Sequence, residues 1–354
     1  MRRLEHNPCA LIRHDIARQS DVKKVLIIGS GGIGRRHLKG YGQTGRASLA
    51  IVEPDPGRRA EATALFGITE SYANIADAPL SHFDLAVICA PANFHVPLMQ
   101  RCAEAGLAFM VEKPLSVTME GVDKALDLVR RNKVEARVGY IRRVAEEVIA
   151  LRNQIVAGKI GTLRLAYLNA SQEFPKYRPD FQQTYYARPE MGGGAILDAA
   201  SHLFDMLIWI MGKPTDVSCM FDRLVLTDTD TEDTCLVCIR FASGAMANVA
   251  INQFQKPNIA TFEFIGTAGN LMIDHSALKF ADDDSGIWKE DHNYMQGLVP
   301  VEAHQARFKM QANAMLDAIE GKPCWLATLD EARDNLRVAL AAKQSWLEKR
   351  IIGL

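Results

Sequence analysis

The chain has little net charge and no long hydrophobic run. Its 354 residues carry 41 lysines and arginines against 42 aspartates and glutamates, which gives a formal net charge of -1. This balance argues against nucleic acid as a partner, and a hydrophobic content of 48% argues against a disordered or collagen-like chain. Apolar runs such as 203–211 are interrupted by Asp205 and fall short of the roughly 20 residues that span a bilayer. No membrane partner is predicted.

Paired cysteines and a secretory signal are also missing. The spacing of Cys235 and Cys238 matches half of a zinc site, but no second pair accompanies it, so no metal is predicted. Residues 1–21 lack the apolar core of a secretory signal; we interpret them as an N-terminal extension, either a packed arm or a floppy tail, and predict a cytoplasmic protein. The seven cysteines are odd in number and scattered, which is typical of reduced thiols: Cys9, Cys89, Cys102, Cys219, Cys235, Cys238 and Cys324.

A glycine motif follows the first apolar run of the chain. Residues 24–28 read as a strand that is buried on both faces, and residues 33–41 read as the helix after it. Between them lies G-x-G-x-x-G, whose glycines permit a tight turn, a close approach to a pyrophosphate and close packing of helix on strand. The pyrophosphate would face the positive end of the helix. The predicted dinucleotide-binding residues here are Gly29, Gly31, Gly32, Ile33 and Gly34.

An acidic residue ends the second apolar run. Residues 49–52 read as a strand, and Glu53 follows directly. A carboxylate at this place accepts hydrogen bonds from the 2′-hydroxyl of an adenine ribose and repels a 2′-phosphate. NAD is therefore the predicted cofactor, although Arg58 and Arg59 close behind leave NADP open.

Strands and helices continue to alternate through the first part of the chain. We predict strands at 85–90, 108–111 and 135–139 and helices at 96–105 and 119–132, which indicates a doubly wound parallel sheet. Ligands bind beyond the carboxyl ends of such strands. Further cofactor candidates at these ends are Ala90, Pro91, Asn93, His95, Glu112 and Lys113. Pro114 fixes the backbone after Lys113, which would hold the ammonium at the cleft; an ordinary solvated lysine is the alternative.

A run of three glycines leads into an apolar helical segment. Glycines 192–194 indicate a close backbone approach, and a helix is predicted to begin near Gly194. Asp198 and His202 are spaced i, i+4 on it, which places a carboxylate and an imidazole on one face. They are candidates for an acid/base pair. The alternative is a core helix whose polar residues merely satisfy one another.

Taken together, these motifs resemble those of one protein family. The chain is similar, from about residue 22 to about 347, to the glucose-fructose oxidoreductase, inositol dehydrogenase and rhizopine-catabolism (Gfo/Idh/MocA) family. The resemblance rests on the motifs 29–34, 91–95, 112–114, 139–143 and 192–212. It implies a Rossmann domain followed by an α/β domain with a large, open, mostly antiparallel sheet. Short alternating runs at 162–170, 216–223, 234–241, 245–254, 261–266 and 270–274 agree with that sheet, and 303–320 and 329–348 read as helices.

The resemblance sets the expected domains and partners. We expect a dinucleotide-binding domain at 22–142, a substrate-binding and oligomerisation domain at 143–330, and a C-terminal helix at 331–354 that packs back on the body. By analogy with the family, the chain is expected to form a homodimer or homotetramer through the open sheet. The expected substrate is a small sugar-like molecule.

The resemblance also implies an activity, the NAD(P)-dependent interconversion of a secondary alcohol and a ketone on a sugar, a cyclitol or a sugar derivative. His202 would be the general acid/base, Lys113 would hydrogen-bond the reacting oxygen, and Asp198 would orient the lysine or a neighbouring hydroxyl. One alternative is an epimerase, hydrolase or transferase of the same family that recycles its cofactor. Another is a non-catalytic regulatory protein that binds a dinucleotide.

The remaining substrate candidates each have a structural alternative or a departure from the family pattern. Ile141 stands where many relatives carry a polar residue, so the usual sugar contact there is in doubt. Arg143 matches a family arginine, with a substrate contact and a structural ion pair both open. Tyr186 and Arg188 lie just before the glycines and either line the pocket or pack within their loop.

Overall fold

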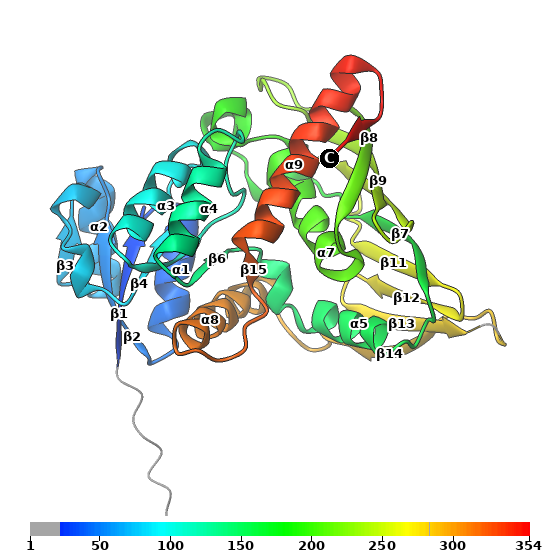
Figure 1. Cartoon of the computed structure of the whole chain (residues 1–354), viewed down its shortest axis with the longest axis horizontal. Coiled ribbons are helices and arrows are strands. Elements are labelled where there is room, and N and C mark those ends of the chain that lie inside the picture. Colours follow the sequence, from blue (N-terminus) through cyan, green and yellow to red (C-terminus); the bar gives the residue numbers. More distant parts are fainter. Residues whose placement is uncertain (1–21, 283) are drawn as a thin grey trace, which may run out of the picture.

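The computed structural model describes residues 22–282 and 284–354 (Figure 1). The extension predicted at 1–21 lies outside the described residues. Two sheets lie side by side, one built mostly from the first third of the chain and one from the rest. The α/β fold class predicted from the sequence is confirmed.

The first sheet is a doubly wound parallel sheet. The strand order is β15-β6-β5-β4-β1-β2-β3, and neighbours from β1 to β6 run parallel. Its strands are β1 (Lys23–Ile28), β2 (Ala47–Val52), β3 (Glu70–Tyr72), β4 (Leu85–Ile88), β5 (Ala108–Val111), β6 (Ala136–Val138) and β15 (Ala327–Thr328). Its helices are α1 (Gly32–Gly42), α2 (Pro56–Phe66), α3 (His95–Glu104) and α4 (Val122–Arg131). Every predicted strand and helix of this half is confirmed to within a few residues.

The sequence analysis missed α2 in this half. The helix begins with the side chain of Asp55 accepting a hydrogen bond from the Arg58 backbone N–H, and Pro56 occupies its first position. Both are recognised helix-start signals. Most of α2 is exposed and only Ala62 is buried, so it has no apolar stripe to reveal it.

The second sheet is open and mostly antiparallel. Its order is β14-β13-β12-β11-β7-β10-β9-β8-β16, and in the described part of the chain all of its neighbouring strands are antiparallel except β7 and β10, which pair in parallel. Its strands are β7 (Leu163–Asn169), β8 (Pro214–Asp222), β9 (Thr234–Phe241), β10 (Met246–Asn252), β11 (Thr261–Gly266), β12 (Gly269–Asp274), β13 (Ala277–Asp282), β14 (Lys289–Asn293) and β16 (Ile352–Gly353). The runs predicted as strands in this half are confirmed, while β13, β14 and β16 were not predicted.

Among the residues that the structure describes, helices cover one face of the second sheet and leave the other uncovered. They are α5 (Glu146–Val156), α7 (Ser201–Met211) and α9 (Leu329–Glu348), and Figure 1 shows them on the side toward the first sheet. Burial alternates strictly along β9, as expected for a sheet with one packed face. Cys235 is consequently buried while Cys238 is exposed on the opposite face, so the two thiols of the suspected zinc spacing point apart. Within residues 22–282 and 284–354, no group of three or more His, Cys, Asp or Glu side chains is placed to hold a metal.

The second half of the chain returns to complete the first sheet, so the predicted domain at 143–330 needs correction. Helix α8 (Pro300–Ile319) packs on α1, and β15 pairs antiparallel with β6. Met315 and Leu316 of α8 share a core with Val25 and Ile27 of β1. At Gly40, a Cβ would lie 2.9 Å from the Phe308 backbone, so only glycine permits this helix contact. The apolar face of α1 is thereby removed from water.

The most apolar helical stretch is a core element. Residues Pro189–Met211 are long and apolar enough to cross a membrane by length and composition, with a mean hydropathy of 1.4. However, 78% of the 18-residue window with that hydropathy is buried inside the protein. Figure 1 shows α7 between the second sheet and α9, the position of a helix in a protein core.

Candidate functional site

Lys113 is held at the carboxyl end of β5. Its Nζ donates to the Asp198 carboxylate Oδ1 at 2.6 Å and to the Asp198 backbone carbonyl at 2.9 Å. The side chains of Lys113 and Asp198 are only 15% and 13% exposed. The alternative of an ordinary solvated lysine is therefore wrong. A nearly buried ion pair at the end of a parallel strand lies where ligands bind in this kind of sheet.

Asp198 lies in a π-helical turn instead of a regular helix. The predicted helix does begin after Gly194, but Ala195–Ala200 is π-helical and the α-helix starts only at Ser201. Such turns occur frequently at functional sites. The Tyr185 hydroxyl donates to Asp198 Oδ1 at 2.9 Å, so this carboxylate oxygen accepts from both a phenol and an ammonium. The charge of Asp198 raises the pKa of Tyr185 well above its usual value, which keeps the phenol protonated as a donor.

The glycine run brings the loop before it against this turn. A Cβ on Gly193 would lie 2.1 Å from the carbonyl oxygen of Tyr186, and Gly194 has a φ of 94° with the Glu232 carboxylate where its Cβ would stand. Side chains at these places would clash, so the backbone approach predicted from the glycines is confirmed. Sequence reasoning did not identify Tyr185 as the partner of Asp198. Its only signal was its place before the glycine run.

His202 lies in the first turn of α7 with an unpartnered ring nitrogen. Its Nδ1 is buried and has no hydrogen-bond partner among the described residues, and its ring meets the Tyr140 ring edge-on at 6.1 Å. Burial lowers the pKa of His202 well below its usual value, and the positive charges of Lys113 and Arg142 lower it further. The imidazole is therefore neutral near pH 7. A neutral, unbonded imidazole beside a lysine is suited to accept a proton.

The glycine loop after β1 fits a dinucleotide. A Cβ on Gly34 would lie 2.0 Å from the Gly29 carbonyl oxygen, so α1 packs on β1 as closely as the motif requires. Gly29 has a φ of 98°, which favours glycine. A Cβ on Gly31 or Gly32 would meet no atom of the described residues within 4 Å, so the backbone here faces open space at the helix N-terminus. A pyrophosphate fits such a place.

Glu53 lies at the end of β2, where a carboxylate that binds the adenine ribose is expected. Its Oε2 accepts from the Ser30 backbone N–H at 2.9 Å and from the Ser30 hydroxyl at 3.1 Å. Its Oε1 accepts from the Asp55 backbone N–H at 3.1 Å and pairs with the Arg58 guanidinium at 3.2 Å. Burial raises the pKa of Glu53, but these hydrogen bonds outweigh burial and leave the pKa below its usual value. The carboxylate is ionised and rigidly placed.

The side chains of two predicted cofactor residues are occupied by contacts within the protein. His95 is buried, with Nδ1 2.9 Å from the Pro114 carbonyl oxygen and Nε2 2.8 Å from the Ala90 carbonyl oxygen. Glu112 is buried as well, and its Oε1 is 2.6 Å from Nε2 of His37 on α1. Both side chains hold together the loops that form the cofactor edge.

Three other predicted cofactor residues lie on the short turn between β4 and α3. Ala90 is partly exposed there, while Pro91 and Asn93 are exposed. This turn is at the same sheet edge as the glycine loop, because β4 lies beside β1. Their contact with the cofactor stays a prediction.

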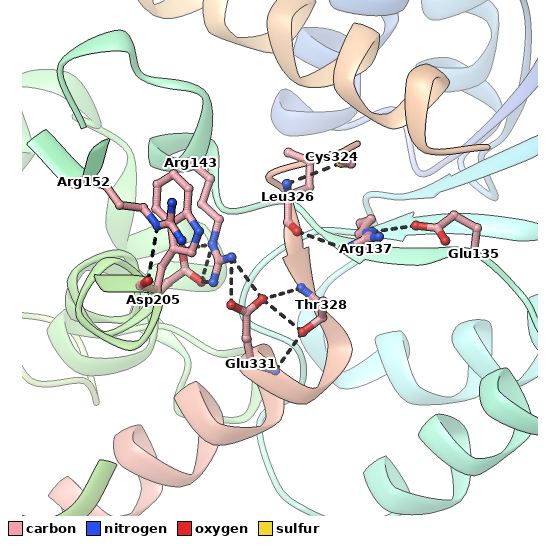
Figure 2. Close-up of polar contacts among 10 residues, drawn as sticks. Glu135, Arg137, Arg143, Arg152, Asp205, Cys324, Leu326, Thr328 and Glu331 are labelled. Atoms are coloured by element: carbon pink, nitrogen blue, oxygen red, sulfur yellow. Dashed lines mark hydrogen bonds and ion pairs between the residues drawn. The ribbon is translucent and has the colours of Figure 1, made fainter. Parts of the chain in front are cut away.

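Arg143 forms a structural ion network, so its predicted substrate contact is corrected. Its guanidinium pairs with Asp205 of α7 at 2.8 Å and with Glu331 of α9 at 3.0 Å (Figure 2). Glu331 also closes a capping box with Thr328 at the start of α9. Arg143 is 2% exposed and all of its guanidinium nitrogens donate within the protein. The alternative left open by the sequence, a structural ion pair, is what the structure shows.

The loop before the glycine run packs partly on itself. Tyr186 is buried and stacks against Phe174, with ring centroids 4.2 Å apart, so packing within the loop describes it better than a substrate contact. Arg188 is exposed and lines a surface cavity together with Arg223 and Asp228. The substrate role of Arg188 stays a prediction.

Two family descriptions match the chain and divide it as the fold does. Residues 23–140 match an oxidoreductase family with an NAD-binding Rossmann fold, GFO/IDH/MocA. Residues 148–272 match the GFO/IDH/MocA C-terminal domain. NAD is thus the cofactor type of this Rossmann domain.

Characterised relatives and solved structures agree with this assignment. The rhizopine catabolism protein MocA of Rhizobium meliloti is 28% identical over 69% of this chain and 75% of its own length. The myo-inositol 2-dehydrogenase of Thermotoga maritima is 28% identical over 94% of this chain and 98% of its own length. A solved structure of levoglucosan dehydrogenase with NADH and levoglucosan has a TM-score of 0.81 at 22% identity, over 94% of this chain and 99% of that one, and shows the same fold. The chain therefore belongs to the GFO/IDH/MocA family of NAD-binding oxidoreductases.

Proposed function

We propose that this protein is an NAD-dependent dehydrogenase that oxidises a secondary alcohol of a polyhydroxy compound to a ketone and catalyses the reverse reaction. The observation that carries the proposal is the cluster of Lys113, Asp198 and Tyr185 beside a neutral His202. Two relatives, an inositol 2-dehydrogenase and a levoglucosan dehydrogenase, support a sugar or cyclitol substrate.

The proton chemistry is assigned to the chain's own residues. His202 accepts the hydroxyl proton, since its lowered pKa leaves the imidazole neutral at the start of the reaction. Lys113 donates a hydrogen bond to the same oxygen and stabilises the charge that develops there. Asp198 and Tyr185 fix the position of the ammonium, which would otherwise sample many rotamers. Bound NAD supplies the acceptor for the two electrons that leave the carbinol carbon.

The oligomer is proposed to form through the uncovered face of the second sheet. Side chains on neighbouring strands lie opposite one another across this face: Met220 is opposite Leu236, Met246 is opposite Arg240, and Tyr167 is opposite the partly buried Glu263. Met220, Leu236, Met246 and Tyr167 are all large exposed hydrophobic residues. A broad apolar sheet face is typical of an interface between copies of a chain. The cytoplasmic location stays a prediction.

The proposal is tested by turnover with a panel of cyclitols, sugars and sugar acids in the presence of NAD. Formation of reduced nicotinamide, followed by its absorbance, is the expected result. Product formed with no change in that absorbance would instead favour the alternative of an epimerase, hydrolase or transferase with internal recycling. Binding of NAD and ligand with no product from any substrate would favour a regulatory protein and overturn the proposal.

A further inference from the structure

An arginine without an ion-pair partner faces the region of His202. Arg142 lies on the 3₁₀ turn Ile141–Val144, which contacts both α7 and α8. Its guanidinium carbon lies 4.8 Å from the centre of the Phe262 ring, on the packed face of the second sheet. Within residues 22–282 and 284–354, Arg142 makes no salt bridge, although it is partly buried. A guanidinium that is partly withdrawn from water without an anion is costly, and a missing ligand anion would account for it.

Other cations near this region come from three further segments of the chain, α1, α8 and the loop after α6. Arg36 lies on α1 with its guanidinium carbon 5.8 Å from the Phe308 ring, and His304 meets that ring edge-on at 5.5 Å. Arg307 lies one turn further along α8, and Arg178 follows the short helix α6 (Phe174–Tyr177) near Tyr185. Partial burial and then the charges of Arg36, Arg307, Arg142 and Arg178 lower the pKa of His304 to about 4, so all four charges act on this one imidazole.

The carboxylates of this region are already paired. Asp198 binds Lys113, Glu112 binds His37, and Glu147 pairs with Arg307 at 2.5 Å. Three positive charges have no carboxylate partner, because no salt bridge joins Arg36, Arg142 or Arg178 to another of the residues that the structure describes. Burial and then the charge of Arg307 lower the pKa of Arg142 to about 10, so the guanidinium remains charged near neutral pH. The substrate end of the site is therefore strongly positive.

Arg142 lies on a different element from the place predicted for the cofactor phosphates, whereas Arg36 is on α1, the helix whose N-terminus forms that place. The pyrophosphate is expected at the N-terminus of α1, next to Gly31. The turn that carries Arg142, in contrast, contacts α7, and Tyr140 just before that turn meets the ring of His202, the proposed general base, at 6.1 Å. An anionic group bound by Arg142 would therefore be part of the substrate and not of the cofactor.

We propose that the substrate is a polyhydroxy compound with an anionic group, a carboxylate or a phosphate, that Arg142 binds with help from Arg36 and Arg178. The proposal rests on the proposed function and specifies its substrate class. Arginine presents a planar fork of donors that matches both anions, and paired charge-assisted hydrogen bonds give orientation as well as affinity. The anion would fix which hydroxyl of the substrate meets His202. Neutral sugars and cyclitols would bind without this anchor and react more slowly.

The test compares matched anionic and neutral substrates in the wild type and the Arg142→Gln variant. The probes are gluconate and glucuronate as sugar acids, glucose 6-phosphate as a sugar phosphate, and glucose and myo-inositol as neutral compounds. We expect the wild type to show a kcat/KM at least about 10-fold higher for one of the anionic classes. For that anionic class, the Arg142→Gln variant is expected to have a kcat/KM about 10-fold to 100-fold below that of the wild type, mainly because its KM is higher. Its loss of kcat/KM on neutral substrates should be smaller. Which anionic class is favoured distinguishes a carboxylate from a phosphate.

A control and a second variant keep this test decisive. Arg101→Gln removes an exposed arginine on α3 and should change no kinetic constant. Arg142→Lys keeps a charge without the fork and should recover part of the loss, and thermal melts of each variant check that it folds. Equal losses on anionic and neutral substrates, or a preference of the wild type for neutral ones, would overturn the proposal.

A binding measurement separates this inference from the proposed function. Calorimetric titration of the wild type with NADH present, using the same five compounds, needs no turnover. Tighter binding of an anionic compound that Arg142→Gln abolishes supports the anion site even if no reduced nicotinamide forms in any assay. Absence of such binding overturns the anion site and leaves a neutral-substrate dehydrogenase standing.

Discussion

The ammonium of Lys113 lies 2.6 Å from the carboxylate of Asp198, and these two residues come from different halves of the molecule. Lys113 follows β5 of the first sheet, while Asp198 belongs to the π-helical turn that leads into α7. The two residues are 85 positions apart in the chain. The proposed reacting centre therefore depends on how the two halves pack, and any change that separates them should affect turnover before it affects cofactor binding.

The first prediction concerns this ion pair. Lys113→Met and Asp198→Asn should each lower kcat by about 100-fold to 10,000-fold, because each removes a charge that positions the reacting oxygen. NADH affinity should change little, which fluorescence titration measures. The double variant should be little worse than Lys113→Met alone, since the two residues act as a unit. Lys124→Met, at an exposed position of α4, is the control. Additive losses would show that the two residues act independently.

The second prediction concerns cofactor choice. Glu53→Gln should weaken NAD binding and improve the use of NADP, since the substitution removes the negative charge that repels a 2′-phosphate. Arg58, now paired with Glu53 at 3.2 Å, would then be available to the phosphate. Ratios of kcat/KM for NAD and NADP measure the change. An unchanged ratio would mean that Glu53 does not contact the adenine ribose.

The third prediction concerns the Arg143 network. Asp205→Asn should destabilise the protein by about 3 to 5 kcal/mol, because removing one partner of a buried ion pair leaves a charge uncompensated. The guanidinium keeps only Glu331, whose side chain is 29% exposed. Denaturant unfolding measures the loss, and Asp330→Asn, which alters an exposed pair on α9, should have little effect. A loss below about 1 kcal/mol would contradict the structural role assigned to Arg143.

The fourth prediction concerns the uncovered sheet face. Leu236→Asp combined with Met220→Asp should yield a smaller species in analytical ultracentrifugation, since paired charges at the centre of an apolar interface oppose association. The two side chains face each other on β8 and β9 and are exposed in the single chain, so folding should survive. A wild type that sediments as a monomer would refute the proposed oligomer.

The fifth prediction concerns pH. The folded protein holds His202 with a pKa below its ordinary value, so the acid limb of the kcat/KM profile for alcohol oxidation should fall below about pH 6.5. The same shift affects stability. The unfolded chain takes up a proton near about pH 6.5 that folded His202 does not, so its contribution to stability is lost as the pH falls below that value. An acid limb at or above about pH 7 would conflict with a buried neutral imidazole.

Local patterns in the sequence were enough to predict the cofactor half. Gly29, Gly34 and Glu53 follow apolar strands at a spacing set by one βαβ unit, and their roles depend on neighbours within a few dozen residues. The position of Lys113 was predictable for the same reason, because it comes directly after a buried strand. Helix α2 escaped because it is mostly exposed, although Asp55 marked its start.

Contacts between distant segments could not be predicted from the sequence. Nothing near Arg143 indicates that Asp205 and Glu331 would surround it, because each comes from a different helix. The return of α8 to cover α1 depends on Gly40 meeting Phe308, which no periodicity reveals. The π-helical turn at Asp198 likewise packs against β9, β10 and α9, which are distant in the sequence, and helical spacing alone predicted a regular helix there.

The central claim, that His202 handles the proton, is tested most directly by the His202→Asn variant. Its side chain fits the same space without a titratable ring. With the substrate identified by the panel and NAD saturating, we predict a kcat at least about 100-fold below wild type, together with an unchanged affinity for NADH. A variant that turns over within about threefold of the wild type, at the same pH and with the same cofactor affinity, would contradict the account.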